Sequence, residues 1–121
     1  MENLLEIAKE FNLKYQELWN QNEFEELSNL YSINSILVGY EIVQNRENIA
    51  KILQQIYDQG WTKIKIETVK TSNIDDNIIL VANIYEAFNS KDANAKPLKT
   101  KSSHVLNKID NVWLTKMHSA F

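Results

Sequence analysis

The C-terminal stretch from Pro97 to Phe121, PLKTKSSHVLNKIDNVWLTKMHSAF, decides the fold of this chain. Polar and apolar residues alternate on both sides of Asp110-Asn111, which predicts two long strands folded back on each other around a turn. Both histidines of the chain, His104 and His118, lie on these strands. We expect the hairpin to form one wall of a pocket that N-terminal helices close.

Two further strands are predicted before this hairpin. Trp61 to Ser72 alternates apolar and charged residues, and Asp75-Asp76-Asn77 is a turn. Ile78 to Asn89 is apolar on both faces, with Ile79, Val81 and Tyr85 on one face and Ile78, Leu80, Ala82, Ile84 and Phe88 on the other. Helices can cover one face, and a second subunit is the economical cover for the other. We therefore expect a homodimer built on the outer face of the sheet.

Helical periodicity dominates the first half of the chain. Apolar residues at steps of three and four predict an amphipathic helix from Glu2 to Asn20. Asn22 and Glu25 resemble a capping box before a short second helix that carries Phe24, Leu27, Leu30 and Tyr31 inward. Ile36 to Val38 predicts a short strand, and Asn45 is expected to cap a third helix, Arg46 to Gln59, which Gly60 ends.

Helices and long antiparallel strands are segregated along the chain, which is typical of the α+β class. The length of 121 residues fits a single domain, 1–121, with one core. A hydrophobic content of 44% with only two Gly and one Pro excludes a disordered or linker-rich protein.

Charge and cysteine content exclude several function classes. The net charge of −3 with scattered signs argues against nucleic-acid binding, and a minority interpretation gives the lysines between Lys91 and Lys101 an anion-binding role. The absence of cysteine excludes disulfides, thiolate metal sites and Cys nucleophiles. No apolar run approaches a membrane span and the N-terminus is acidic, so we expect a cytoplasmic protein with no membrane partner.

Three motifs in this order resemble the nuclear transport factor 2-like superfamily, which includes ketosteroid isomerases and SnoaL-like polyketide cyclases. They are Leu18 to Tyr31, similar to the family's helix, polar turn and helix; Asn45 to Ile49, similar to the start of its third helix; and Trp113 to Ser119, similar to its closing strand. The resemblance implies a cone-shaped barrel in which a strongly curved, mostly antiparallel sheet packs on three N-terminal helices.

The resemblance to the isomerase is incomplete at the catalytic centre. The isomerase uses an Asp general base, with a Tyr and a protonated Asp as the oxyanion hole. Its Tyr matches Tyr15, five residues before Asn20, but its base falls on Gly39, which has no side chain. Its second oxyanion donor falls near Ser103 to Val105, where His104 is the only titratable side chain. Tyr15 and His104 are therefore the candidate catalytic residues, although a satisfied or exposed strand histidine remains an alternative.

The orientation of the C-terminal strands depends on their register. If even residues face inward, Leu98, Thr100, Ser102, His104 and Leu106 line the cavity and the lysines stay in water. A family-style register points Val105 and Asn107 inward instead, and a bulge could satisfy both. On the last strand the family register points Met117, Ser119 and Phe121 inward and His118 outward.

The remaining candidate ligand-binding residues are Trp19, Asn83 and Tyr85, together with Met117, Ser119 and Phe121. Trp113 is expected to fill the core near the turn. Buried polar atoms on Tyr15, Asn83 and Tyr85 need partners, and a ligand or ordered water is a natural one. We expect neither a metal nor another cofactor, because the two histidines are predicted to face opposite ways and no third ligand has a recognisable spacing.

The sequence thus favours an apolar pocket for a hydrophobic small molecule with a carbonyl or hydroxyl. The protein would be a binding domain or a SnoaL-like isomerase, cyclase or hydrolase without the general-base Asp. The alternative is a non-catalytic dimerisation or protein-interaction module whose cone is filled by its own side chains. The fold does not decide between them, because one fold carries many functions.

Overall fold

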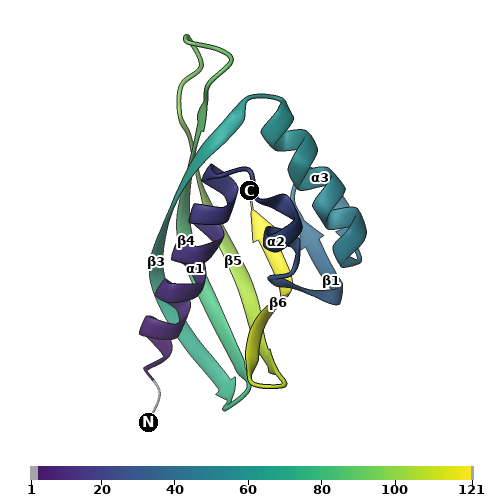
Figure 1. Ribbon diagram of the computed structural model, residues 1–121. Helices are drawn as coiled ribbons and strands as arrows, with labels where there is room; N and C mark the ends of the chain where they lie inside the picture. Colours follow the sequence, from purple (N-terminus) through teal and green to yellow (C-terminus); the bar gives the residue numbers. More distant parts are fainter. Residues whose placement is uncertain (1–2, 121) are drawn as a thin grey trace.

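Six strands form one curved mixed sheet that packs against three helices (Figure 1). This arrangement is seen in a computed structural model that describes residues 3–120. The helices are α1 (Leu4–Asn20), α2 (Phe24–Ser28) and α3 (Arg46–Asp58). The strands are β1 (Tyr31–Val38), β2 (Ile42–Gln44), β3 (Trp61–Asp75), β4 (Ile78–Asn89), β5 (Leu98–Ile109) and β6 (Val112–Ala120).

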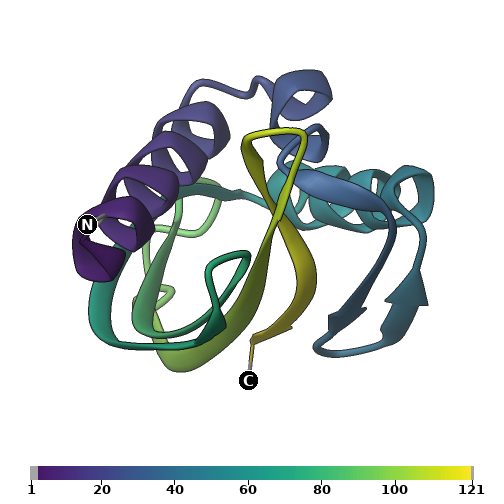
Figure 2. The same ribbon diagram turned by 90° about the horizontal axis from the view of Figure 1, so that it is seen from below.

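The sheet has the strand order β2-β1-β6-β5-β4-β3 and does not close into a barrel. All pairs are antiparallel except β1 with β6, which run parallel. Figure 2 shows the sheet from below as a curved wall, with α1 lying across its concave side. The predicted α+β cone with three N-terminal helices is confirmed.

The hairpin of β5 and β6 forms as its sequence predicts. Asp110 and Asn111 have φ values of 50° and 64°, and Ile109 pairs with Val112 across them. Positive φ at both central residues is the geometry that matches the twist of the flanking strands, and Asp and Asn adopt it at low cost. The bounds predicted for the doubly apolar strand, Ile78 to Asn89, are also those of β4.

Local signals at the helix starts were partly wrong. Asn22 and Glu25 do not form a capping box, because Asn22 has φ 59° and Glu23 occupies the cap position of α2. Asn45 occupies the N-cap position of α3 with φ 79°. Its side chain makes no capping hydrogen bond to the residues of this helix, Arg46–Asp58. Only α1 has a side-chain cap among the three helices of residues 3–120: Oδ1 of Asn3 accepts from the amides of Leu5 and Glu6.

The first edge of the sheet is larger than predicted. β1 begins at Tyr31, which was expected to lie in the second helix, and β2 was not predicted. β1 forms over this length because it pairs with β6, where Tyr31 lies opposite Thr115 and Leu37 opposite His118. β6 is distant from β1 in the sequence. The residues next to Tyr31 alone favoured a helix, because they do not show this pairing.

A β-bulge at Lys116 breaks the alternation of β6. Leu106 pairs with Thr115 and Val105 pairs with Met117, so Lys116 is the extra residue between them. A bulge shifts the inward and outward phase of every residue beyond it. Thr115 and His118 therefore share the concave face of the sheet, and Met117 lies on the convex face with 40% of its surface exposed.

The core lies between the concave face of the sheet and the helices. Leu27, Ile49, Ile79 and Leu106 are fully buried, and each such side chain contributes roughly 1.5–3 kcal/mol. No helix among residues 3–120 is both long enough and apolar enough to cross a membrane.

Candidate functional site

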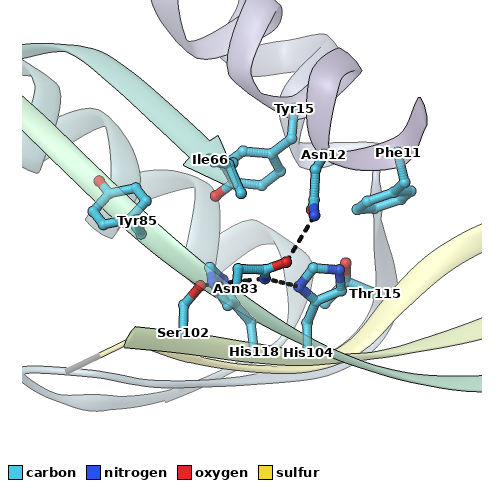
Figure 3. Close-up of a pocket in the computed structure, with 10 residues that line it drawn as sticks. All are labelled: Phe11, Asn12, Tyr15, Ile66, Asn83, Tyr85, Ser102, His104, Thr115 and His118. Carbon is cyan, nitrogen blue, oxygen red and sulfur yellow. Dashed lines mark hydrogen bonds between the residues drawn. The ribbon is translucent and has the colours of Figure 1, made fainter. Parts of the chain in front are cut away.

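A small cavity of about 20 Å³ lies between α1 and the concave face of β3, β4, β5 and β6 (Figure 3). Its lining is polar and aromatic: Phe11, Asn12, Tyr15, Ile66, Asn83, Tyr85, Ser102, His104, Thr115 and His118. A space of this size accommodates about one water molecule. None of these lining residues is a carboxylate, so the cavity wall offers only neutral groups and imidazoles.

One turn of α1 supplies the helical wall of the cavity. Phe11, Asn12 and Tyr15 point from this helix toward the sheet, as Figure 3 shows. Positions three and four apart share a helix face, which places Tyr15 beside Phe11 and Asn12. All three side chains are buried, with exposed fractions of 8% or less.

Two tyrosines and a histidine form one hydrogen-bonded chain. The hydroxyls of Tyr15 and Tyr31 are 2.8 Å apart, and the Tyr31 hydroxyl is 2.9 Å from Nδ1 of His118. Tyr31 is fully buried, so its hydroxyl depends on these two partners. The chain connects the phenol at the cavity wall with an imidazole on the neighbouring strand.

A second polar chain crosses the cavity floor. The Nδ2 of Asn12 donates to Oδ1 of Asn83 at 2.8 Å and lies 2.7 Å from Oγ1 of Thr68. The amide of Asn83 lies 3.1 Å from Nδ1 of His104 and donates to Oγ of Ser102 at 3.3 Å. The other imidazole nitrogen of His104, Nε2, is buried and has no hydrogen-bond partner among residues 3–120. An unpaired buried polar atom of this kind costs about 1–3 kcal/mol.

Burial keeps every titratable group of the cavity neutral near pH 7. It lowers the pKa of His104 to about 3, with a smaller contribution from His118, whose ring centroid is 6.0 Å away. It lowers the pKa of His118 to about 4 and raises the pKa of Tyr85 to about 12. Burial, followed by the proximity of Tyr31, raises the pKa of Tyr15 well above its usual value, and burial also raises the pKa of Tyr31.

Four of the predicted site residues meet at this cavity: Tyr15, Asn83, Tyr85 and His104. The inward orientation of even residues on β5 holds for Ser102, His104 and Leu106, which are buried. It fails for Leu98, which is 51% exposed at the start of the strand. The alternative register is wrong at Val105, which lines the opposite face of the sheet.

The predicted orientations on β6 are reversed. His118 lines the cavity, whereas Met117 and Ser119 line a hollow on the convex face. The cause is the bulge at Lys116, which moves the residues after it by one position. Phe121 lies outside the described residues.

The two histidines were predicted to face opposite ways, which argued against a metal site. This prediction is wrong, because His104 and His118 line the same cavity. Even so, no group of three metal-ligating side chains occurs in the described part of the chain.

Trp19 does not reach the cavity. It is 2% exposed and packs edge-on against Phe24 and Tyr57, and its Nε1 donates to the carbonyl of Trp61 at 2.9 Å. Trp19 is a core residue because it lies one helical turn beyond Tyr15, beside α2 and α3. Trp113 is partly buried near the turn, with Nζ of Lys108 5.7 Å from its ring.

Sequence reasoning missed Asn12, Tyr31 and His118 as members of the site. Asn12 carried a usable signal, since it is an amide on the apolar face of the first helix between Phe11 and Tyr15. Tyr31 was expected to point inward, but from a helix. His118 gave no local signal, because the bulge that turns it inward depends on pairing with β5 and β1.

A larger hollow of about 380 Å³ lies on the convex face of the sheet. Lys70, Leu80, Val105, Met117 and Ser119 are among its lining residues. Leu80 and Met117 are each 40% exposed there. The apolar outer face that the sequence predicted for β4 is therefore present and uncovered in the single chain.

Solved structures with the same fold are numerous although their sequences differ. A ketosteroid isomerase-like protein from Erwinia carotovora atroseptica SCRI1043 superposes with a TM-score of 0.84 at 13% identity, covering 99% of this chain and 96% of the other. The chain has the nuclear transport factor 2-like fold. An NTF-2 like protein of unknown function from Shewanella oneidensis MR-1 superposes with a TM-score of 0.81 at 14% identity, covering 93% of this chain and 94% of the other. No family model matches the sequence, and no curated protein matches it.

Gly39, where the sequence resemblance was expected to place the isomerase base, lies in the bend after β1, and its amide donates to the carbonyl of Glu41 at 3.1 Å. Tyr15 occupies the expected helix face, and the polar wall opposite it is built from His104, Asn83 and His118. The wall opposite Tyr15 thus carries imidazoles and an amide, and none of the residues that line the cavity is a carboxylate.

Proposed function

We propose that the chain binds a hydrophobic small molecule with an oxygen function in its cone, as an acid–base enzyme of the SnoaL-like isomerase, cyclase or hydrolase type. The observation that carries this proposal is the Nε2 atom of His104, which is buried at the cavity wall without a partner in residues 3–120. Buried polar atoms in proteins are almost always paired, so an unpaired one beside a cavity favours a bound group.

Acid–base chemistry is supported by the hydrogen-bonded chain of Tyr15, Tyr31 and His118. Tyr15 presents a phenol to the cavity, and Tyr31 connects it to Nδ1 of His118. Such a chain can pass a proton from a ligand at Tyr15 through Tyr31 to Nδ1 of His118, which leaves the ligand negatively charged and the imidazole positively charged. General acid–base groups need this kind of hydrogen-bond reach before their pKa values matter.

A ligand larger than water requires the cavity to open. Ile66, Tyr85 and His118 are the partly exposed members of its wall, and movement of Ile66 and Tyr85 would enlarge it. Ligand binding would therefore be accompanied by a rearrangement of these side chains.

The alternative function is a non-catalytic dimerisation or protein-interaction module. The small cavity volume of about 20 Å³ favours it, because the cone is nearly filled by its own side chains. The number of polar groups on the wall favours the first function, since a core that only needs filling is built from apolar residues.

A binding screen with matched variants separates the two functions. The screen titrates cyclic ketones and cyclic alcohols into ¹⁵N-labelled protein and follows the amides of β4 and β5 by NMR. Tyr15→Phe and His104→Ala are expected to weaken binding about tenfold each, the loss of one hydrogen bond. Tyr57→Phe removes the same phenol outside the cavity lining and is expected to leave binding unchanged. If no compound shifts these amides, the filled-cone function replaces the proposal.

We also propose that the chain forms a homodimer through the convex face of the sheet. Leu80, Phe88 and Met117 are 37–40% exposed there, and the hollow between strands is lined largely by apolar atoms. Exposed apolar side chains of this kind favour an interface with a second copy.

A further inference from the structure

Asn12, Asn83 and His104 form a line of hydrogen bonds from α1 across β4 to β5 (Figure 3). The two ends of an asparagine amide are chemically different, since Oδ1 only accepts and Nδ2 only donates. In Asn83 the Oδ1 atom accepts from Nδ2 of Asn12 at 2.8 Å. Its Nδ2 therefore faces Nδ1 of His104 at 3.1 Å and donates to it.

This polarity fixes the proton on the imidazole. Burial lowers the pKa of His104 to about 3, so the ring is neutral near pH 7 and carries one proton. Nδ1 accepts from Asn83, and the proton must therefore lie on Nε2. Nε2 is the atom that is buried at the cavity wall without a partner among residues 3–120.

We infer that Asn12 and Asn83 are positioning residues that hold His104 as its Nε2–H tautomer, so that the cavity takes a ligand with a hydrogen-bond acceptor oxygen, a cyclic carbonyl compound. The ligand class rests on the proposed function, whereas the tautomer does not. His104 in this form donates a hydrogen bond to a carbonyl and cannot abstract a proton. A ligand that must donate to His104 is excluded, which separates carbonyl compounds from ligands bound through a hydroxyl proton.

The tautomer is measured on the free protein. Long-range ¹H–¹⁵N correlation spectra at pH 7 distinguish the protonated from the unprotonated imidazole nitrogen. We expect Nε2 of His104 to be protonated and Nδ1 to be bare. A protonated Nδ1 in the unmodified protein overturns the inference.

Asn12→Asp tests whether Asn12, which acts on His104 only through Asn83, sets the tautomer of His104. Once the ¹³Cγ chemical shift of the new carboxyl shows that it is ionised, position 12 only accepts, so Asn83 must turn its Nδ2 toward it and its Oδ1 toward His104. The proton of His104 is then expected to move to Nδ1. An unchanged tautomer in a folded variant whose new carboxyl is ionised overturns the positioning role.

Two further variants complete the series. If Asn12→Asp does not fold, Asn83→Asp gives the same reading, because its carboxylate still accepts from Asn12 and requires Nδ1–H on His104. Ser102→Ala is the matched control: it removes the other acceptor of Asn83 without imposing a polarity and is expected to keep Nε2–H. A tautomer change in Ser102→Ala would assign control to Ser102 and overturn the inference.

The ligand class is tested with two probes of equal shape, cyclohexanone and methylenecyclohexane. The unmodified protein is expected to bind the ketone about tenfold more tightly, and Asn12→Asp should abolish this preference. Equal binding of both probes to the unmodified protein overturns the carbonyl class. If neither probe binds while the tautomers behave as expected, the ligand class and the proposed function fail and the positioning role of Asn12 and Asn83 stands.

Discussion

The imidazoles of His104 and His118 lie in one polar cluster, yet each is held by a different partner. His104 receives a hydrogen bond from an amide, whereas His118 meets the hydroxyl of Tyr31. The first partner fixes a tautomer, and a hydroxyl can donate or accept and so allows either one. At the scale of residues, the imidazole of His104 on β5 thus lies beside a hydrogen-bonded chain of Tyr15 on α1, Tyr31 on β1 and His118 on β6.

Tyr31→Phe is expected to destabilise the protein by about 1–3 kcal/mol, because the buried hydroxyl of Tyr15 and the partly buried Nδ1 of His118 lose their shared partner. Urea unfolding followed by tryptophan fluorescence measures the loss. Tyr40→Phe removes the same group from a fully exposed side chain and should change the unfolding free energy by less than about 0.5 kcal/mol. Equal effects of the two changes would contradict the buried role of Tyr31.

The two histidines should make stability fall as the pH is lowered from about 6.5 to about 4. Their folded pKa values, about 3 and about 4, lie below the usual value of about 6.5, so the unfolded chain binds more protons in this window. Each histidine contributes a slope of up to about 1.4 kcal/mol per pH unit, and no further loss below its folded pKa.

NMR titration of the imidazole Cε1–H signals isolates this effect from that of the carboxylates. Both histidines are expected to remain neutral at pH 5 in the folded protein. Midpoints near 6.5 would show that the rings are solvated and would remove the predicted slope.

At the scale of elements, short irregularities decide where long strands point. The bulge at Lys116 turns His118 into the site, and the turn at Asp110-Asn111 sets the register of β5 against β6. The end of α3 is a third such point. Gly60 follows this helix with φ +112°, a conformation that a side chain adopts only at a cost.

Gly60→Ala is expected to destabilise the protein by about 1–3 kcal/mol through backbone strain, with a further loss from crowding. A Cβ at this position would lie 2.3 Å from Oδ1 of Asn89. Gly39→Ala is the matched control, since its Cβ would lie at an ordinary 3.4 Å from the carbonyl of Ala120. Thermal unfolding of both variants measures the difference, and a smaller loss for Gly60→Ala than for Gly39→Ala would contradict it.

At the scale of the whole molecule, the concave face of the sheet carries the core and the polar cavity, and part of the convex face is apolar and exposed. The concave face is covered by α1 and encloses the cavity, whereas the convex face leaves Leu80 and Met117 exposed in the single chain. The proposed dimer would cover that face and leave the cavity to its own ligand.

Leu80→Lys is expected to convert the proposed dimer to monomer, because a charge placed in an apolar interface must be desolvated. A stable interface on this face should bury about 1,200–2,000 Å². Analytical ultracentrifugation of both forms tests this, with Leu13→Lys on the exposed side of α1 as control. A monomeric unmodified protein at micromolar concentration would overturn the dimer.

The sequence by itself determined the order of helices and long strands, the hairpin at Asp110-Asn111, the bounds of β4 and the helix face that carries Tyr15. These follow from local periodicity and turn chemistry, which act between residues close in the chain. It also indicated His104, Asn83 and Tyr85 as inward groups. The sequence therefore predicted four of the residues that line the cavity, Tyr15, Asn83, Tyr85 and His104.

Only the tertiary structure decided that His118 and Tyr31 belong to the site, that Met117 and Ser119 do not face it, and that Trp19 lies in the core. Each of these depends on a contact between distant segments: the bulge of β6 against β5, the parallel pairing of β1 with β6, and the packing of α1 against α2 and α3. A shift of one residue in strand pairing exchanges the two faces of a sheet, and local alternation cannot show where such a shift occurs.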